Sequence, residues 1–294
     1  MPDRETLLLI DGHAAAYRAF YAIRNLTGPD GAPTNAIFGF LKAFHRDRER
    51  VEPTQIAVVW DGGLDEERTE MLPGYKSERD PMPDAMEAQL DGMVEWLEAS
   101  GIASICEEGV EADDIIATLA RRAEASGQAV VIASADKDFF QLINDRIGLL
   151  NPNDKTGVIW SDGQVFDKTG VRPEQIVDWL SLVGDAVDDI PGVSGVGPKT
   201  AAKWLAKFGT LDALLEGIDE VTPERFREPL RELADDLRRN QDLVRLREDL
   251  PVPTAPASLV PSDGDYARLH ALYTRWGFRG FLTELESARQ PDLL

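Results

Sequence analysis

The sequence is poor in the residues that build disulfides and zinc sites. Its 294 residues include one cysteine, Cys106, and three histidines, His13, His45 and His270. A single cysteine excludes an internal disulfide, which agrees with a reducing compartment. Because protein zinc sites are built mainly from thiolates and imidazoles, this composition also argues against a zinc enzyme.

Long apolar runs are missing as well. No stretch approaches the roughly 18 residues that a membrane span requires. The first residues, MPDRETLLLIDGH, lack the basic start, the longer apolar core and the small-residue cleavage site of a signal peptide. We therefore expect a cytoplasmic protein without a membrane partner, and we expect it to act as a monomer.

Basic residues are scarce relative to acidic ones. The chain has 31 lysines and arginines against 53 aspartates and glutamates, a net charge of −22. Such a charge argues against a nucleic-acid partner unless a basic surface is concentrated locally. A generally acidic surface is the expected cause of the excess.

What the chain does contain is a regular alternation of apolar runs and helical patterns. Between residues 6 and 134 the patterns predict strands at 6–11, 56–60, 102–106 and 129–134, and helices at 13–22, 34–51, 84–100 and 112–125. This alternation predicts an α/β fold with a mainly parallel sheet and helices on both of its faces.

The pattern changes at about residue 171, where short helices with Gly and Pro punctuation replace it and no convincing strand follows. Residues 250–263 contain four prolines and read as an extended connector, after which two closing helices are expected at 266–276 and 281–287. The chain is therefore expected to divide into an α/β core at 1–170 and a helical region at 171–294.

Acidic residues recur where strands end, helices begin or Gly-containing turns reverse the chain. There are nine of them: Asp11, Asp61, Glu111, Asp113, Asp114, Asp136, Asp138, Asp185 and Asp188. Side chains at the carboxyl ends of parallel strands converge on one crevice. Two like charges about 4 Å apart repel by roughly 4 kcal/mol at an effective dielectric near 20. A converged cluster of this kind requires cations, and carboxylates suit a hard divalent metal such as Mg²⁺.

The densest acidic group opens a predicted helix in GVEADDIIATLA. Acids in a first helical turn also stabilise the helix dipole, which would explain one or two of them. Glu111 and Asp114 are three residues apart and share a helical face, whereas Asp113 points elsewhere. Asp113 is therefore the weakest direct ligand of the three.

A stretch of over twenty residues, 62–83, separates a predicted strand from a predicted helix and shows no clear periodicity. It is either a misread element or a mobile functional loop. It carries the cations and the aromatic residue nearest to the expected crevice, namely Arg68, Tyr75, Lys76 and Arg79.

The segment 184–209 combines a glycine turn with lysines. Gly192, Gly195 and Gly197 precede a helix starting at Pro198, so backbone N–H groups and the positive helix end can face a phosphate. Lysines follow at four-residue spacing, and residues 192–209 contain no acid; the lysines are Lys199, Lys203 and Lys207. This combination predicts contacts to a nucleic-acid backbone without base reading.

Taken in order, the motifs LLLIDGHAAAYRAFYA, PTNAIFGF, YKSER, EADD, DKD and GDxxDDIPGVxGVGPKTA resemble the 5′-nuclease family. The likeness is to the 5′→3′ exonuclease domain of bacterial DNA polymerase I and its free-standing relatives, cousins of the flap endonucleases. It runs from about residue 6 to beyond residue 215, and more weakly through RWGFRGFLTEL. It implies a PIN-like nuclease core, a helix–three-turn–helix at about 184–209 that binds duplex DNA, and two Mg²⁺ or Mn²⁺ ions.

The resemblance also implies roles for individual residues. One metal would be held by Asp11, Asp61, Glu111, Asp114 and Asp136, with Asp113 acting through water, and the other by Asp136, Asp138, Asp185 and Asp188. Lys76 and Arg79 match catalytic basic residues of an arch at 62–83 through which a 5′ strand passes, and Tyr75 matches a base-stacking position. DNA contacts are expected from Arg68, Tyr75, Lys76, Arg79, Gly195, Gly197, Lys199, Thr200, Lys203 and Lys207. The Gly192–Gly197 turn matches a region that often holds a monovalent cation such as K⁺ through backbone carbonyls.

The implied activity is that of a structure-specific 5′→3′ exonuclease or flap endonuclease in DNA replication and repair, acting on DNA with a 5′ flap or a 5′ end and working with a DNA polymerase. Three departures from the family pattern occur. ASADKD stands where TGDKD is common, Asp189 stands where Asn is common, and the arch after Arg79 is acidic, which favours weaker DNA binding.

Two alternatives remain. A PIN-type ribonuclease would use the same acidic core without needing the lysine-bearing turn, and a catalytically weak DNA-binding module would not need the complete acidic set. The chain starts at Met1 and ends at Leu294 without polymerase regions, which favours a separate protein over a fragment of a polymerase.

Overall fold

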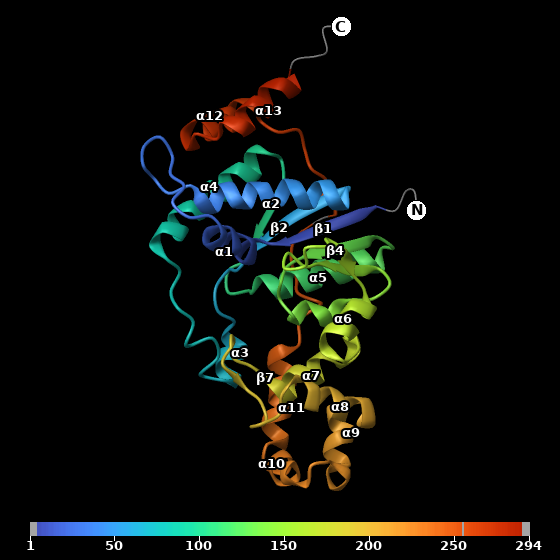
Figure 1. Ribbon diagram of the computed structural model, residues 1–294. Coiled ribbons are helices and arrows are strands. Elements are labelled where there is room, and N and C mark those ends of the chain that lie inside the picture. Colours follow the sequence, from blue (N-terminus) through green and yellow to red (C-terminus); the bar gives the residue numbers. More distant parts are fainter. Residues whose placement is uncertain (1–4, 255, 290–294) are drawn as a thin grey trace.

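A six-stranded sheet forms the centre of the computed structural model, which describes residues 5–254 and 256–289 (Figure 1). The strand order is β3-β2-β1-β4-β5-β6, and all neighbours are parallel except β5 and β6. The strands are β1 (Thr6–Asp11), β2 (Gln55–Trp60), β3 (Ala103–Cys106), β4 (Ala129–Ala133), β5 (Ile147–Leu150) and β6 (Ile159–Trp160). The predicted mainly parallel sheet is confirmed, and β5 and β6 are additions that were too short to stand out in the sequence.

Helices cover both faces of the sheet because the strands are apolar on both sides. In β1, Leu8 and Ile10 pack into one apolar cluster while Leu7 and Leu9 pack into another, as the two-residue period of a strand requires. The first cluster lies under α1 (Gly12–Ala22), α2 (Asn35–Val51) and α4 (Asp84–Ala99), and the second lies under α5 (Ala112–Ala125).

The helical region lies beyond the α5 face, at the lower end of the molecule in Figure 1. It shares its apolar cluster with α5, so it forms a continuation of the core. Its helices are α6 (Asp162–Thr169), α7 (Ile176–Val183), α8 (Pro198–Phe208), α9 (Leu211–Glu216), α10 (Arg227–Glu232) and α11 (Ala234–Val244), and it includes the hairpin of β7 (Gly184–Asp185) and β8 (Ile190–Pro191). Short 3₁₀ helices occur at Asp138–Leu142, Pro173–Gln175, Ile218–Glu220, Glu224–Phe226 and Pro256–Leu259.

The closing helices return to the opposite end of the core. α12 (Tyr266–Trp276) and α13 (Arg279–Arg289) pack near α4, where the Trp96 indole N–H donates to the Tyr273 hydroxyl at 2.9 Å (Figure 1). α12 and α13, which the sequence analysis grouped with the region 171–294, thus lie against the α/β core. Within the described residues, no helix is both long enough and apolar enough to span a membrane.

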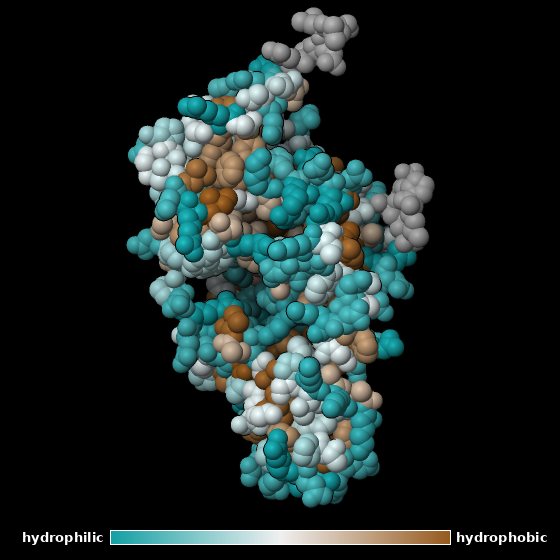
Figure 2. All heavy atoms as spheres, viewed as in Figure 1, coloured by the Kyte–Doolittle hydropathy of each residue, from teal (hydrophilic) through white to brown (hydrophobic). Residues whose placement is uncertain are grey.

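The stretch 62–83 is partly ordered, which differs from a structureless loop. It contains α3 (Glu66–Met71), which Asp65 caps by accepting the N–H of Arg68 at 3.0 Å. Six residues are too few for a helical period to show in the sequence. The arch lies between the core and the helical region, and the viewed face of the molecule is hollowed there (Figure 2).

Candidate active site

Three aspartates meet at the carboxyl edge of the sheet. Asp11 ends β1, Asp61 follows β2, and Asp136 lies three residues after β4. Because β1 lies between β2 and β4, their carboxyl ends are adjacent. The chain adds β2 and β3 on one side of β1 and then β4 on the other side, so the strand order reverses at β1. In open α/β sheets, ligands bind at the carboxyl ends of the strands next to such a reversal.

Backbone and hydroxyl groups fix these three carboxylates. Asp11 accepts the N–H of Ala14 at 3.0 Å and the hydroxyl of Ser134 at 2.9 Å. Asp61 accepts the N–H of Ala112, and Asp136 accepts the N–H of Asp138, each at 2.9 Å. Each side chain therefore has a defined orientation before any ligand binds.

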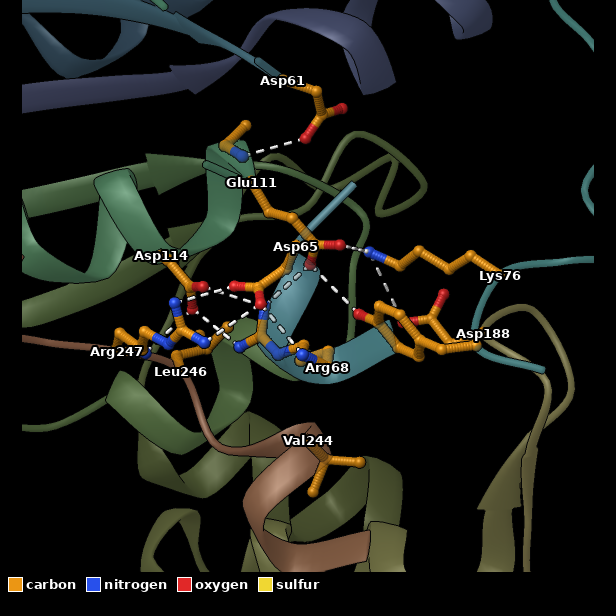
Figure 3. Close-up of polar contacts among 12 residues, drawn as sticks. Asp61, Asp65, Arg68, Lys76, Glu111, Asp114, Asp188, Val244, Leu246 and Arg247 are labelled. Carbon is orange, nitrogen blue, oxygen red and sulfur yellow. Dashed lines mark hydrogen bonds and ion pairs between the residues drawn. The ribbon is translucent and has the colours of Figure 1, made fainter. Parts of the chain in front are cut away.

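Glu111, at the start of α5, is the best-buried carboxylate of this edge after Asp114 (Figure 3). Its Oε2 accepts from the Arg68 guanidinium at 2.8 Å and from the Tyr75 hydroxyl at 3.1 Å. Its Oε1 lies 2.7 Å from the Lys76 ammonium. The two oxygens thus have different surroundings, since one is held by fixed groups and the other by a side-chain cation.

Asp114 lies beside Glu111 but is turned to Arg68. Both of its oxygens are bonded to Arg68, at 2.8 and 2.9 Å, and Oδ1 also accepts the N–H of Arg247 at 2.8 Å (Figure 3). Asp113 instead lies within electrostatic reach of Lys76, Glu111, Asp136 and Asp61.

These surroundings differ from the sequence argument, which made Asp113 the weakest direct ligand of the three; the metal ligand set itself stays a prediction. The helical-face argument placed Glu111 and Asp114 together because they are three residues apart. Glu111 and Asp114 do lie together, because the same Arg68 nitrogen contacts Oε2 of Glu111 and Oδ2 of Asp114, each at 2.8 Å. Arg68 occupies both oxygens of Asp114, whereas Oε1 of Glu111 remains turned to Lys76.

A second group of carboxylates comes from the helical region. The β7–β8 hairpin brings Asp185 and Asp188 to Asp138, and one oxygen of each lies within 4.8 Å of the others. The hairpin closes because Gly184 and Gly192 touch: a Cβ at Gly184 would lie 2.4 Å from the Gly192 nitrogen. No larger residue fits at this position.

We call the carboxylates of Asp11, Asp61, Glu111, Asp113, Asp136, Asp138, Asp185 and Asp188 the acidic cluster. Side-chain cations lie against it: Arg79 is 2.6 Å from Asp188, Lys137 is 3.0 Å from Asp185, and Lys76 is 3.9 Å from Asp188. Lys76 has a left-handed backbone, φ 53°, and its N–H donates to the Asp188 carbonyl at 3.1 Å. The arch and the hairpin are therefore joined at the site.

The acidic cluster resists full ionisation. Burial, together with the charges of Asp61 and Asp136, raises the pKa of Asp11 to about 7. Burial and neighbouring carboxylates likewise raise the pKa values of Asp113, Asp136 and Asp138. The Asp136 side chain is exposed at the surface, but the surrounding protein still makes burial the largest cause of its raised pKa.

These carboxylates fit a divalent cation. The Oδ1 atom of Asp138 is buried without a hydrogen-bond partner among the described residues, beside Asp185 and Asp188. Neighbouring carboxylates repel one another when all are ionised, and a bound cation removes that repulsion. A hard cation such as Mg²⁺ prefers carboxylate oxygens of this kind as ligands.

Two residues expected to contact DNA, Arg68 and Tyr75, are buried in this structure. Arg68 is 2% exposed and bonded to two carboxylates, and Tyr75 is 3% exposed with its hydroxyl on Glu111. A phosphate cannot reach the first side chain and a base cannot stack on the second. Arg79, by contrast, keeps 47% of its side chain exposed.

The lysines of α8 lie on the surface. Lys199 and Lys203 are exposed and form no ion pair within the described residues, whereas Lys207 is 3.0 Å from Glu220. Thr200 is half-buried in the first turn, after Gly195, which has φ 78°, and Gly197, the N-cap. The helix begins at Pro198, as predicted.

Two further residues of the site escaped the sequence analysis. Ser134 fixes Asp11, and its only sequence signal is its place between β4 and Asp136. His13 accepts the N–H of Asp61 through Nδ1 at 3.0 Å, and burial lowers its pKa, so the 3.3 Å contact of the same nitrogen with the Asp61 carboxylate is not an ion pair.

Tyr17 was also missed. It lies near Arg79 and Asp61, whose charges act on its hydroxyl, and its ring stacks on that of Tyr21 with centroids 6.5 Å apart. Tyr21 is 64% exposed. The available signal was the four-residue spacing of the two tyrosines, which places them on one face of the helix that follows Asp11.

An acidic cluster that fits divalent cations lies at the carboxyl edge of the sheet, and α8 carries exposed lysines; both features are expected of the class of metal-dependent nucleases. The chain belongs to the 5′-3′ exonuclease family: residues 6–172 match the 5′-3′ exonuclease N-terminal resolvase-like domain, and residues 171–267 match the 5′-3′ exonuclease C-terminal SAM fold.

Curated proteins similar to this chain include DNA polymerases I. The thermostable enzyme of Thermus thermophilus is 38% identical over 280 residues, which are 95% of this chain and 32% of that protein. The Bacillus caldotenax enzyme is 37% identical over 293 residues, which are 98% of this chain and 33% of that protein. The chain thus spans about a third of the length of these relatives.

Solved structures share the fold over the whole chain. A T5 5′-exonuclease with bound zinc superposes with a TM-score of 0.69 at 18% identity, covering 96% of this chain and 99% of that one. A bacteriophage T5 flap endonuclease in complex with DNA and metal ions gives 0.67 at 20%, covering 97% and 100%. The catalytic core of Rad2 with a DNA substrate gives 0.65 at 18%, covering 96% and 93%. At these identities the likeness establishes the fold.

Proposed function

We propose that this chain hydrolyses DNA phosphodiester bonds near a 5′ end or at a flap junction, as a structure-specific 5′→3′ exonuclease or flap endonuclease in DNA replication and repair. The observation that carries the proposal is the convergence of Asp138 from the sheet edge with Asp185 and Asp188 from the helical hairpin. Because carboxylates from the α/β core and from the helical region form one cluster, the proposed cleavage site would lie beside the region that would hold the duplex.

Two divalent cations, Mg²⁺ or Mn²⁺, would be held by the acidic cluster. Asp11, Asp61, Glu111, Asp113 and Asp136 form one set, and Asp136, Asp138, Asp185 and Asp188 form the other, with Asp114 supporting Glu111 through Arg68. When bound, such a pair of cations lowers the pKa of a water and stabilises the leaving oxygen.

The chain's own cations orient the phosphate. Lys76 and Arg79 now pair with Glu111 and Asp188, and cations bound to these carboxylates would release both side chains toward the phosphate oxygens. Positive charge fixed near a developing oxyanion stabilises it more in a water-poor site than in bulk water. The exposed ring of Tyr21, stacked on the half-buried ring of Tyr17, offers a stacking surface near Arg79.

Duplex DNA would bind along α8. Lys199 and Lys203 and the start of the helix at Pro198 can face consecutive phosphates, while the glycines of the 192–197 turn allow close approach of the backbone. We place a monovalent cation such as K⁺ at this turn. Because the relatives are DNA polymerases I, a DNA polymerase is the proposed partner.

Cleavage of three labelled substrates tests the proposal: a 5′-flap duplex, a blunt duplex and single-stranded RNA, each with and without Mg²⁺. We expect Mg²⁺-dependent cleavage of the flap duplex at or near the junction. Cleavage of RNA in preference to the flap would indicate a PIN-type ribonuclease. Binding of the flap without cleavage would indicate a catalytically weak DNA-binding module.

A further inference from the structure

Arg68 is the most enclosed cation of the site, and it would touch neither the metal nor the DNA. Its guanidinium contacts Glu111 at 2.8 Å and both oxygens of Asp114 at 2.8 and 2.9 Å (Figure 3). It also donates to the carbonyl of Arg245 at 3.1 Å, in the segment that follows α11. At 2% exposure it reaches neither solvent nor DNA.

The contacts of Arg68 divide the two oxygens of Glu111 between two tasks. Oε2 is held by Arg68 and by the Tyr75 hydroxyl, which are both buried. Oε1 is turned to the Lys76 ammonium, 2.7 Å away. It is therefore the oxygen that would be free to bind a metal cation once Lys76 moves away. A carboxylate held by one oxygen presents the other in a fixed direction.

Asp114 completes the arrangement by balancing the charge of Arg68. A lone guanidinium beside Glu111 would weaken the attraction of that carboxylate for a metal, but the bidentate pair with Asp114 neutralises it. The N–H of Arg247 holds Asp114 in turn, at 2.8 Å, and the Arg247 guanidinium pairs with Asp65 at the start of α3. The network therefore joins α3, α5 and the segment after α11 behind one candidate metal ligand.

We propose that Arg68 is a positioning residue of the metal site, which fixes Glu111 for a divalent cation while Asp114 cancels its charge. The inference rests on the proposed function in taking Glu111 as a metal ligand. Groups that orient a metal ligand in this way typically contribute about 10- to 100-fold to metal affinity or activity.

The test uses Arg68→Lys, which keeps the positive charge and loses the planar fork. The matched control is Arg121→Lys. Arg121 lies on α5, the helix that carries Asp114, and pairs with two carboxylates, Glu124 and Glu248, each at 3.0 Å. Glu248 belongs to the segment after α11 that also contains Arg245. The control therefore loosens the contact between α5 and the segment after α11 without touching Glu111.

Two readouts are compared. Calorimetric titration with Mn²⁺ in the absence of DNA measures metal affinity directly, and single-turnover cleavage of the flap duplex is measured across Mg²⁺ concentrations. For Arg68→Lys we expect Mn²⁺ affinity to fall by about 10-fold or more, with a parallel increase in the Mg²⁺ needed for half-maximal cleavage. Excess Mg²⁺ restores most of the rate, and Arg121→Lys behaves as the wild type.

Unchanged Mn²⁺ affinity in a folded Arg68→Lys protein would overturn the proposal, as would an equal loss in the Arg121→Lys control. Should Arg68→Lys fail to fold, the pair Arg68→Gln with Asp114→Asn removes both buried charges together, and the same loss of Mn²⁺ affinity is expected. If the wild type binds Mn²⁺ but cleaves no DNA, the proposed function fails while the titration still decides the role of Arg68.

Discussion

Asp188 and Asp189 are neighbours in the sequence with the same side chain and different surroundings. Asp188 is buried against Arg79 and Asp138 in the acidic cluster. Asp189 has a left-handed backbone, φ 57°, and accepts the N–H of Glu78 at 2.9 Å. Asn adopts this backbone readily and would keep the accepting oxygen, which gives a physical reason for Asn at this position in related sequences.

Asp188→Asn is therefore expected to lower single-turnover cleavage of the flap duplex by at least about 100-fold, because it removes a charged metal ligand. Asp189→Asn, the matched control one residue away, is expected to stay within about twofold of the wild type, since the surface change preserves the contact. Equal effects of the two changes would remove Asp188 from the metal site.

Lys76→Ala separates a role in chemistry from a role in binding. A cation beside the scissile phosphate interacts more strongly with the transition state than with the ground state, so the cleavage rate should fall more than DNA affinity. Lys203→Ala, on α8, should show the opposite pattern. Measuring both quantities on one flap substrate decides the matter, and equal losses for Lys76→Ala would make it an ordinary binding residue.

At the scale of elements, the sequence predicted most helices and core strands but not how the arch is held. The helices at 84–100, 112–125 and 266–276 were clear because their apolar residues repeat over three or more turns. α3 was missed because it is six residues long and is held by tertiary bonds to Asp114 and Arg247. The same contacts explain why the burial of Arg68 and Tyr75 could not be predicted, since their partners lie more than thirty positions away.

α8 carries a prediction of its own. Each phosphate contact contributes about 0.9 to the slope of log affinity against log salt. Replacing Lys199 and Lys203 with Ala should flatten the slope for a flap duplex by about 1.8. Lys207→Ala should change it less, because that lysine already pairs with Glu220. An unchanged slope in the double variant would place the duplex on another surface.

For the whole molecule, the acidic cluster predicts how stability responds to pH and metal. The pKa of Asp11 rises from 3.8 to about 7 on folding, so its contribution favours the fold below about pH 4 and is lost as the pH rises through 7. For Asp11 alone this amounts to at most about 4 kcal/mol. A cation that binds the ionised cluster offsets the loss, and its binding strengthens as protons leave.

We therefore expect saturating Mg²⁺ to raise the Tm by about 5 °C or more at pH 8 and by much less at pH 5.5. Asp11→Asn should raise the Tm of the metal-free protein at pH 8 and reduce the effect of Mg²⁺. Thermal unfolding with Mg²⁺ or with chelator at the two pH values measures both. A Mg²⁺ effect that is equal at both pH values would contradict the account of the cluster.

For the molecule as a whole, the sequence predicted where the aspartates gather but not how the closing helices pack. The apolar strand runs were enough to predict that aspartates meet at the edge of a parallel sheet. The observed strand order, with β1 between β2 and β4, brings Asp11, Asp61 and Asp136 together at that edge. The return of α12 and α13 to the core was not predictable, because it depends on contacts such as Trp96 with Tyr273, 177 positions apart. The surroundings of Asp114 were likewise not predictable, because its oxygens are held by Arg68, 46 positions earlier in the chain.

The central claim is that one acidic cluster, built from the sheet edge and the β7–β8 hairpin, holds two divalent cations. Anomalous diffraction from crystals of the wild-type protein soaked with Mn²⁺ tests it most directly. The account predicts two peaks, one among Asp11, Glu111, Asp113 and Asp136 and one among Asp138, Asp185 and Asp188. Manganese bound elsewhere, with none at these carboxylates, would contradict it.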